Sequence, residues 1–365
     1  MFNKDCNDIK FETEMSDPKN VITRLHGAGG AYMHSLIREY FLPLYDGFGE
    51  VGLDVLDDGA VVNGIVFTTD SYTIKPLFFK GGDIGRLAVS GTVNDIAMMG
   101  GEPIALSLAM VIEEGFPKSD LARIVESIKK TAEEAGVHIV TGDTKVMERG
   151  ALDKMVINTS GIGVASPALK YNFSVLRRTR EVKHEWLVPM NIRDGDKIIV
   201  SGTIGDHAIA ILSSREGIEF EINVESDVAP LNKMIDAVLE VGGVADAKDP
   251  TRGGLADLLN DWSEKSGLGI YVRENDIPVK EEVKSAIEFL GLDLMELGNE
   301  GKAVLAVSPE MARDVLNALH STPWGKDAAI IGEVRKDIKG VILETAIGGK
   351  RLITRPVGDP VPRIC

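Results

Sequence analysis

Strand-like and helix-like segments alternate along this chain, and the alternation limits the folds that it can adopt. The first half is expected to form, in order, a strand at 60–70, a helix at 82–100, a strand at 103–112, a helix at 117–136, and strands at 137–143 and 154–165. In the helix at 117–136, Ser119 is a possible N-cap and Gly136 ends the helical pattern. This half is predicted to be an α/β unit.

A second unit follows an irregular stretch at 166–195. Its expected elements are a strand at 197–202, a loop and helix at 203–217, a helix near 228–242, a strand and turn at 242–254, a helix from about Leu255 and a strand at 302–308. The last stretch, 348–365, contains three prolines and is expected to be an extended arm. The pattern therefore predicts two domains of α/β or α+β class, which 365 residues can supply.

Charge and composition exclude several classes of protein. The net charge of −16 argues against nucleic-acid binding, which needs a clustered basic surface. The N-terminus is polar and acidic, without the apolar region of a signal peptide, and polar residues interrupt the most apolar stretch, 86–112. Two cysteines, Cys6 and Cys365, cannot build a disulfide framework. We expect a cytoplasmic protein that neither crosses a membrane nor binds nucleic acid.

Several aspartates end strand-like segments or lie beside glycine and other small residues. They are Asp58 in DVLDDGAVV, Asp70 in FTTDSY, Asp95 in GTVNDIAMMGG, Asp143 in VTGDTKV and Asp249 in KDPTRGG. Carboxylates that converge at strand ends form a site for a hard cation, usually Mg²⁺ together with phosphate oxygens. A single aspartate in a turn also bonds its own backbone, so each one alone is equally typical of a plain turn.

Two further residues are candidates for charge balance or proton transfer. Lys145 follows an acidic strand end in GDTKV, where a cation would balance phosphate charge; an ordinary surface lysine is the alternative. Glu300 lies between glycines in GNEGK and is either a general base or part of a solvated turn. The chain has no Walker A sequence, and the glycine loop at 201–207, SGTIGDH, is only a weak indication of phosphate binding.

The chain ends on a cysteine. A cysteine thiol has an ordinary pKa of about 8.5, so a small fraction of Cys365 is expected to be thiolate at neutral pH. Fully extended, the run from Thr354 to Cys365 would reach roughly 40 Å. Such an arm suits a swinging carrier better than a fixed catalytic thiol, whereas Cys6, in a polar leader, is expected to be incidental.

Taken in order, these segments resemble the HypE family of hydrogenase maturation proteins. That family lies in a superfamily with aminoimidazole ribonucleotide synthetase, selenophosphate synthetase and thiamine-monophosphate kinase. The resemblance runs from about Val21 to Cys365 and includes HGAGG, DDGAVV, TGDTKV, SGTIGDHAIAIL, DPTRGGLA and NEGK. GTVNDIAMMGGEP and the terminal PRIC point to HypE among these families. A long leader at 1–20 and an enlarged connection at 166–190 depart from the pattern.

The resemblance implies an aminoimidazole-ribonucleotide-synthetase-like fold with one α/β and one α+β domain and a flexible C-terminal tail. The implied parts are a polar leader at 1–20, an ATP-binding and dimerisation domain at 21–165, a linker at 166–195, an α+β domain at 196–345 and a tail at 346–365 that ends in the reactive cysteine. It also implies a homodimer in which the N-terminal sheets of two subunits pair.

The implied reaction is the ATP-dependent dehydration of a carbamoylated C-terminal cysteine to a thiocyanate, which supplies cyanide to the iron of nickel–iron hydrogenase. ATP and Mg²⁺ are the implied cofactors. The carbamoyltransferase HypF is the implied source of the carbamoyl group, and a HypC–HypD complex is the implied acceptor of the cyanide. A terminal thiol on a mobile arm would be able to reach HypF, the protein's own active site and the HypC–HypD complex in turn.

The resemblance also assigns roles to residues by motif. The implied metal ligands are Asp58, Asp70, Asp95 and Asp249; the implied nucleotide-binding residues are Asp70, Asn94, Asp95, Gly142, Asp143 and Lys145; and the implied catalytic residues are Cys365, Glu300 and Lys145. Lys145 and Glu300 are assigned to separate proton transfers as a hypothesis.

Two other functions compete with this one. An enzyme of the same superfamily that acts with ATP on a small molecule would use the same aspartates but would not need Cys365. A non-enzymatic assembly scaffold would use the tail for docking, but it would not need the acidic strand ends together with Lys145 and Glu300.

Overall fold

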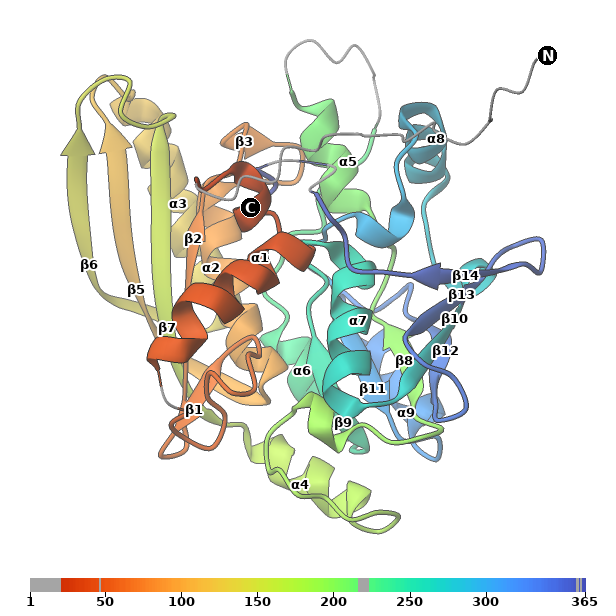
Figure 1. Ribbon diagram of the computed structural model, residues 1–365. Helices are drawn as coiled ribbons and strands as arrows, with labels where there is room; N and C mark the ends of the chain where they lie inside the picture. Colours follow the sequence, from red (N-terminus) through yellow and green to blue (C-terminus); the bar gives the residue numbers. More distant parts are fainter. Residues whose placement is uncertain (1–20, 46, 216–222, 359–360, 362) are drawn as a thin grey trace, which may run out of the picture.

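The computed structural model describes residues 21–45, 47–215, 223–358, 361 and 363–365 (Figure 1). Two sheets dominate it, one in each half of the chain, and helices lie between them and around them. Cys6 and the predicted leader at 1–20 fall outside the described residues. Among the described residues, no helix combines the length and the apolar character that crossing a membrane requires.

The first sheet has the strand order β1-β2-β7-β5-β6. Its strands are β1 (Ala60–Val62), β2 (Ile65–Tyr72), β7 (Met155–Ala165), β5 (Gly101–Glu113) and β6 (His138–Met147). β5 and β6 are parallel, and the other neighbours are antiparallel. The single strand expected at 60–70 is instead a hairpin, because Asn63 and Gly64 both adopt positive φ (53° and 74°), as a tight two-residue turn requires.

Helices α2 (Ile84–Met98) and α3 (Lys118–Ala135) pack together, and α2 lies against β2, β5 and β7. α2 begins where the Asp83 carboxylate accepts hydrogen bonds from the backbone N–H groups of Gly85 (2.7 Å) and Arg86 (3.1 Å). The predicted end of α3 at Gly136 is confirmed, since this residue has a left-handed φ of 81°. The predicted N-cap at Ser119 is wrong, because α3 already begins at Lys118, after Pro117.

The second sheet has the strand order β14-β13-β10-β12-β8-β11-β9. Its strands are β14 (Lys350–Ile353), β13 (Val341–Glu344), β10 (Gly269–Arg273), β12 (Ala329–Arg335), β8 (Lys197–Val200), β11 (Val304–Val307) and β9 (Val244–Lys248). Central strands are buried on both faces: Ile199 and Leu305 belong to one apolar core, and Ile198 and Val304 to another. A small hairpin of β3 (Phe78–Phe79) and β4 (Gly82–Asp83) stands apart from both sheets.

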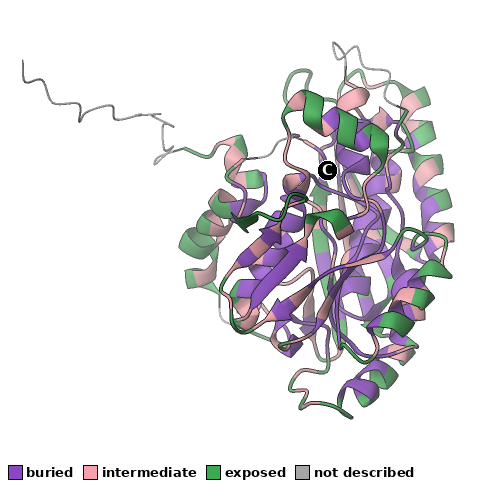
Figure 2. Ribbon diagram, turned by 90° about the vertical axis from the view of Figure 1, so that its right-hand side faces the viewer, coloured by how far each residue is buried: buried purple, intermediate pink, exposed green. Residues whose placement is uncertain are grey.

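Helices complete the second unit. They are α4 (Pro167–Leu176), α5 (Asp206–Ser213), α6 (Asn232–Leu239), α7 (Gly254–Ser266), α8 (Glu281–Leu290) and α9 (Ala312–His320); α1 (Gly30–Leu36) belongs to the N-terminal segment. α6 and α9 contribute to the core shared with the first unit, and α7 packs against β10 and β13 on the other face. Figure 2 shows the result: buried strands inside, and helices with exposed outer faces.

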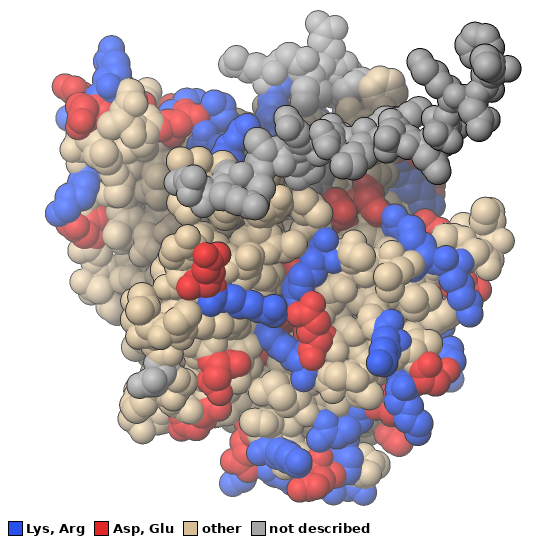
Figure 3. Space-filling view, in the orientation of Figure 1, with Lys and Arg blue, Asp and Glu red and all other residues tan. Residues whose placement is uncertain are grey.

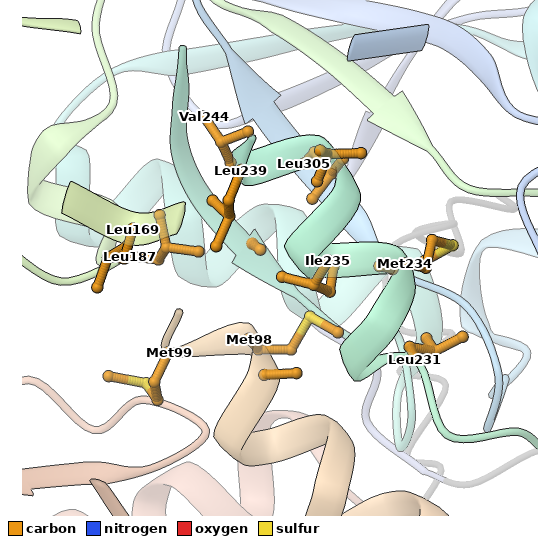
Figure 4. Close-up of a cluster of buried hydrophobic side chains, with 14 of the residues drawn as sticks. Met98, Met99, Leu169, Leu187, Leu231, Met234, Ile235, Leu239, Val244 and Leu305 are labelled. Atoms are coloured by element: carbon orange, nitrogen blue, oxygen red, sulfur yellow. The ribbon is translucent and has the colours of Figure 1, made fainter. Parts of the chain in front are cut away.

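One apolar core joins the two halves. Figure 4 shows Met98, the last residue of α2, beside Ile235 of α6, with Met99, Leu231 and Met234 in the same cluster. Phe173 and Leu176 of α4 are buried in the same core, so the stretch predicted as a linker at 166–195 is packed along part of its length. This contact fixes α2, and the polar residues that it carries, relative to the second sheet. Figure 3 shows acidic and basic side chains interspersed over the visible surface.

Candidate active site

A cavity of about 290 Å³ lies where β2, α1, α7 and the C-terminus meet. Its walls include six residues that the sequence predicted for the site: Asp58, Asp70, Asp95, Asp249, Glu300 and Cys365. They are separated by up to 307 positions (Asp58 to Cys365) and come from both halves of the chain. The C-terminus of the described chain is therefore next to the predicted acidic site.

The acidic residues reach the cavity from different elements. Asp70 is on β2 and Asp95 is on α2. The hydroxyl of Thr68, also on β2, donates a hydrogen bond to the Asp95 carboxylate (2.8 Å). Burial, followed by repulsion from Asp249, raises the pKa of Asp95 well above its ordinary value. Burial, followed by repulsion from Asp58, does the same for Asp249, and burial raises the pKa of Asp58 to about 6. This excess of negative charge favours binding of a cation.

Two basic residues beside Asp249, in the segment KDPTRGG, also line the cavity. The ammonium of Lys248 contacts Asp58 and lies 3.1 Å from Asp57. Burial opposes its charge, but Asp58 and Asp57 outweigh burial and hold the pKa of Lys248 well above its ordinary value. Lys248 was not predicted from the sequence, although its position next to Asp249, a predicted metal ligand, was a usable signal.

Arg252 is the second basic residue of this segment. Its guanidinium lies 3.8 Å from Asp70, and Cys365, above all other neighbours, raises its pKa further. Glu300 is buried; its backbone N–H donates to Asp227 (3.0 Å), and its Oε1 has no hydrogen-bond partner among the described residues. Burial, then Asp249 and Asp70, raise the pKa of the Glu300 carboxyl well above its ordinary value. An ionised Glu300 would therefore be a strong base.

The tail is held at its root and at its end. At the root, Arg355 donates to Asp257 (2.7 Å) and to Glu264 (3.1 Å), and the carbonyl of Pro356 accepts from the backbone N–H of Ala31 (3.0 Å). At the end, the backbone N–H of Thr73, just after β2, donates to the Cys365 carbonyl (3.1 Å). The cysteine that ends the chain is thus drawn into the cavity in this structure.

Four predicted nucleotide-binding residues lie elsewhere. Asn94 is buried and bonds to backbone groups of the second unit: it donates to the carbonyl of Ala229 (3.1 Å) and accepts from the N–H of Leu231 (2.7 Å). Gly142, Asp143 and Lys145 are exposed on β6, where Lys145 pairs with Asp143 at 3.1 Å. Two strands separate β6 from β2, which places these residues roughly 14 Å from Asp70 across the sheet. Their contact with a nucleotide stays a prediction.

The proposed metal ligands also stay a prediction. Within the part of the chain that the structure describes, three or more His, Cys, Asp or Glu side chains do not gather into a group that could hold a metal ion by itself. The oxygen chemistry of the cavity nevertheless fits Mg²⁺, since the buried Oδ2 of Asp58 has no hydrogen-bond partner in the part of the chain that the structure describes. These residues suit a cation that takes its remaining ligands from phosphate.

Comparisons with known proteins agree with this geometry. Residues 56–165 match the family described as AIR synthase related protein, N-terminal domain, and residues 193–343 match the corresponding C-terminal domain. The carbamoyl dehydratase HypE of Rhizobium leguminosarum bv. viciae is 43% identical over 344 residues, which cover 93% of this chain and 94% of that protein. The Escherichia coli K12 carbamoyl dehydratase HypE is 41% identical over 352 residues, covering 95% of this chain and all of that protein.

Solved structures show the same relationship. HypE in a HypE–HypF complex is 46% identical with a TM-score of 0.79, covering 88% of this chain and 100% of that one. HypE in complex with ATP is 41% identical with a TM-score of 0.75, covering 94% of this chain and 100% of that one. A thiamine monophosphate kinase from Aquifex aeolicus, at 20% identity and a TM-score of 0.58, covers 82% of this chain and 93% of that one and shows the shared fold alone.

The predicted two-domain fold and the resemblance that led to it are therefore confirmed. The chain belongs to the AIR synthase related family and, within it, to the HypE group of hydrogenase maturation proteins.

Proposed function

We propose that this protein uses ATP to dehydrate the carbamoylated thiol of its own Cys365 to a thiocyanate during maturation of nickel–iron hydrogenase. One observation carries the proposal: Cys365 lies in the same cavity as Glu300 and the acidic residues predicted to bind Mg²⁺ and ATP phosphates. Relatives over nearly the whole chain are named carbamoyl dehydratase, and one was solved with ATP.

The chemistry explains the need for ATP. In the carbamoyl group S–C(=O)–NH₂ the oxygen is a poor leaving group, so transfer of the ATP γ-phosphoryl group to it turns it into phosphate. Breaking the C–O bond and removing both nitrogen protons then forms S–C≡N. The products are thiocyanate, ADP and phosphate, and the carbamoyl group has lost the elements of water.

The residues of the cavity divide these tasks. Glu300, whose pKa is raised by burial and by Asp249 and Asp70, is suited to take a proton from the carbamoyl nitrogen once it is ionised. Arg252 offers a fixed positive charge next to Cys365. When bound, Mg²⁺ would neutralise phosphate charge, and Asp58, Asp70, Asp95 and Asp249 would hold it.

Mass spectrometry tests the reaction directly. The protein, in a Cys6→Ser background, is incubated with HypF, carbamoyl phosphate and ATP, and its intact mass is followed. A carbamoyl mass gain followed by loss of one water, both absent in Cys365→Ala, is the expected result. ATP consumption with some small molecule while Cys365 stays unmodified would support the rival superfamily enzyme instead.

We propose the same partners that the resemblance implies. The HypE–HypF complex among the relatives supports HypF as the protein that loads Cys365. A HypC–HypD complex is the proposed acceptor of the cyanide. Pull-down of each partner with the wild-type protein and with a variant that ends at residue 355 measures how much of each contact depends on the tail.

We also propose a homodimer, in which β6 of each subunit faces the other subunit's cavity. β6 is an edge strand exposed along most of its length, and it presents the apolar side chains Val140 and Val146 to solvent. A symmetric partner would cover this strand. It would also place Asp143 and Lys145 next to the cavity of the other subunit.

Mixed dimers test this arrangement. Lys145→Ala keeps the terminal cysteine, and Cys365→Ala keeps the lysine. If Lys145 acts across the dimer, each variant alone is inactive, and mixing and refolding them restores thiocyanate on the cysteine-bearing subunit. If Lys145 acts within its own subunit, the mixture stays inactive.

A further inference from the structure

The last three residues of the chain are held by a set of specific contacts. The Cys365 carbonyl accepts from the N–H (3.1 Å) and the hydroxyl (3.2 Å) of Thr73, and the Arg363 carbonyl accepts from the N–H of Lys75 (3.2 Å). Ile364 is 3% exposed and belongs to an apolar core that contains residues of both units. The end of the tail therefore runs beside residues 73–75 and is bonded to their backbone.

The remaining backbone carbonyl of this segment has a different partner. The Ile364 carbonyl lies 2.9 Å from Nε2 of His207, which is fully buried in the first turn of α5. Because a carbonyl can only accept, Nε2 must carry the proton and donate it. His207 belongs to the segment SGTIGDH, which the sequence offered only as a weak phosphate loop.

The other ring nitrogen fixes this protonation state. Nδ1 of His207 lies 2.7 Å from the hydroxyl of Ser226, and that hydroxyl oxygen accepts from the backbone N–H of Val228 (3.1 Å). The hydroxyl hydrogen of Ser226 is therefore available to Nδ1, which leaves the imidazole proton on Nε2. The Phe79 ring packs edge-on against the imidazole, with 5.6 Å between ring centroids, and limits its rotation.

We propose that His207 is a positioning residue for the dehydration: its Nε2–H holds the last peptide group of the chain and thereby places the thiol of Cys365 in the cavity. The inference rests on the proposed function for its catalytic consequence and on the contacts above for the docking itself. The peptide that His207 holds joins Ile364 to Cys365, so its rotation moves the thiol directly.

A second tail contact lies at the surface and has a different role. Arg363 pairs with Asp153 at 2.6 Å, where their side chains are 30% and 39% exposed, so water and salt compete for this pair. His207 and the Ile364 carbonyl are shielded from such competition. In this proposal the exposed Arg363–Asp153 pair attracts the tail, and the buried bond from His207 to the Ile364 carbonyl fixes the position of the last residues.

The test compares His207→Leu with His207→Gln, both in a Cys6→Ser background. Leucine fills the apolar surroundings but removes the donor, whereas glutamine places an amide N–H near the position of Nε2. His320→Leu is the matched control, because His320 also has its Nε2 on a backbone carbonyl, that of Ala328 (2.9 Å), away from the tail.

Two readouts are taken. The first is the rate of alkylation of Cys365 by iodoacetamide in the protein alone, which needs no catalytic activity. Loss of one hydrogen bond should raise this rate about tenfold in His207→Leu. The second is single-turnover formation of thiocyanate from the carbamoylated protein, which should fall about 100-fold, because a small misplacement of reacting groups costs that much.

His207→Gln should recover most of both effects, and His320→Leu should match the wild type. Equal alkylation rates in His207→Leu and the wild type, or a glutamine variant no better than leucine, would overturn the proposal. If the wild type itself forms no thiocyanate, the proposed function fails, and the alkylation rates still decide whether His207 docks the tail.

Discussion

The strongest prediction concerns Arg355, which holds the root of the tail. Its guanidinium donates to three carboxylates of α7: Asp257 (2.7 Å), Asp261 (3.3 Å) and Glu264 (3.1 Å). The Arg355 side chain is only 11% exposed. Arg355→Met keeps the length of the side chain and removes all of these bonds.

The expected loss of stability depends on the solvent exposure and the remaining ion-pair partners of each carboxylate after Arg355 is replaced. Glu264 is 49% exposed, so it loses little. Among the described residues, Asp261 keeps Lys265 at 2.6 Å, and Asp257 keeps the more distant His34 at 3.4 Å. Removing one partner of a buried ion pair costs 3–5 kcal/mol, and the remaining contacts place the loss near the lower end, about 3 kcal/mol.

Urea unfolding, followed by circular dichroism, measures this loss. Arg351→Met is the control: Arg351 forms a similar two-pronged pair with Asp293 (2.6 and 3.2 Å), but its side chain is 46% exposed, so less than about 1 kcal/mol is expected. Equal losses in the two variants would refute the argument that burial strengthens the Arg355 anchor.

Gly30→Ala should displace the tail root and lower the melting temperature, because Gly30 has a φ of 71° and an added Cβ would lie 2.2 Å from the carbonyl oxygen of Pro356. Asn94→Ala should cost about 2 kcal/mol in urea unfolding, since it leaves buried backbone groups unpaired. Hydrogen bonds from Lys75 and Arg363 lower the pKa of Asp153 to about 2, below its ordinary value near 3.8. The stability that ionised Asp153 adds to the folded protein is therefore fully present above pH 3.8 and is lost as the pH falls towards 2. The difference in urea midpoint between wild type and Asp153→Asn should therefore be constant from pH 5 to 8 and should vanish near pH 2.

The sequence was most informative where a local pattern is sufficient. Glycines and acidic residues at strand ends predicted the positions of Asp70 and Asp249, and apolar spacing predicted α2 and the end of α3 at Gly136. The hairpin at Asn63–Gly64 was missed although these two residues are its usual signal, because the β-branched residues on both sides resemble one strand.

Residues that act through distant contacts could not be predicted in this way. His207 meets the backbone of a residue 157 positions later, and no local pattern encodes that contact. Lys145 was expected after a strand end but lies inside β6 (His138–Met147), and its neighbours depend on the strand order of the sheet, which puts β6 at the edge. Strand order is set by tertiary packing, so a local pattern can indicate that a lysine is present here but not which residues surround it.

The anchored root of the tail also sets a local concentration. With Pro356 fixed to α1, the nine residues from 357 to 365 can carry the thiol at most roughly 30 Å from that point. One thiol in a sphere of that radius corresponds to an effective concentration on the order of 10 mM. A docking site with an intrinsic dissociation constant of about 1 mM would then hold the tail about nine-tenths of the time. Weak docking is enough for reaction in the cavity, and it leaves the cysteine outside often enough for other proteins to load and unload it.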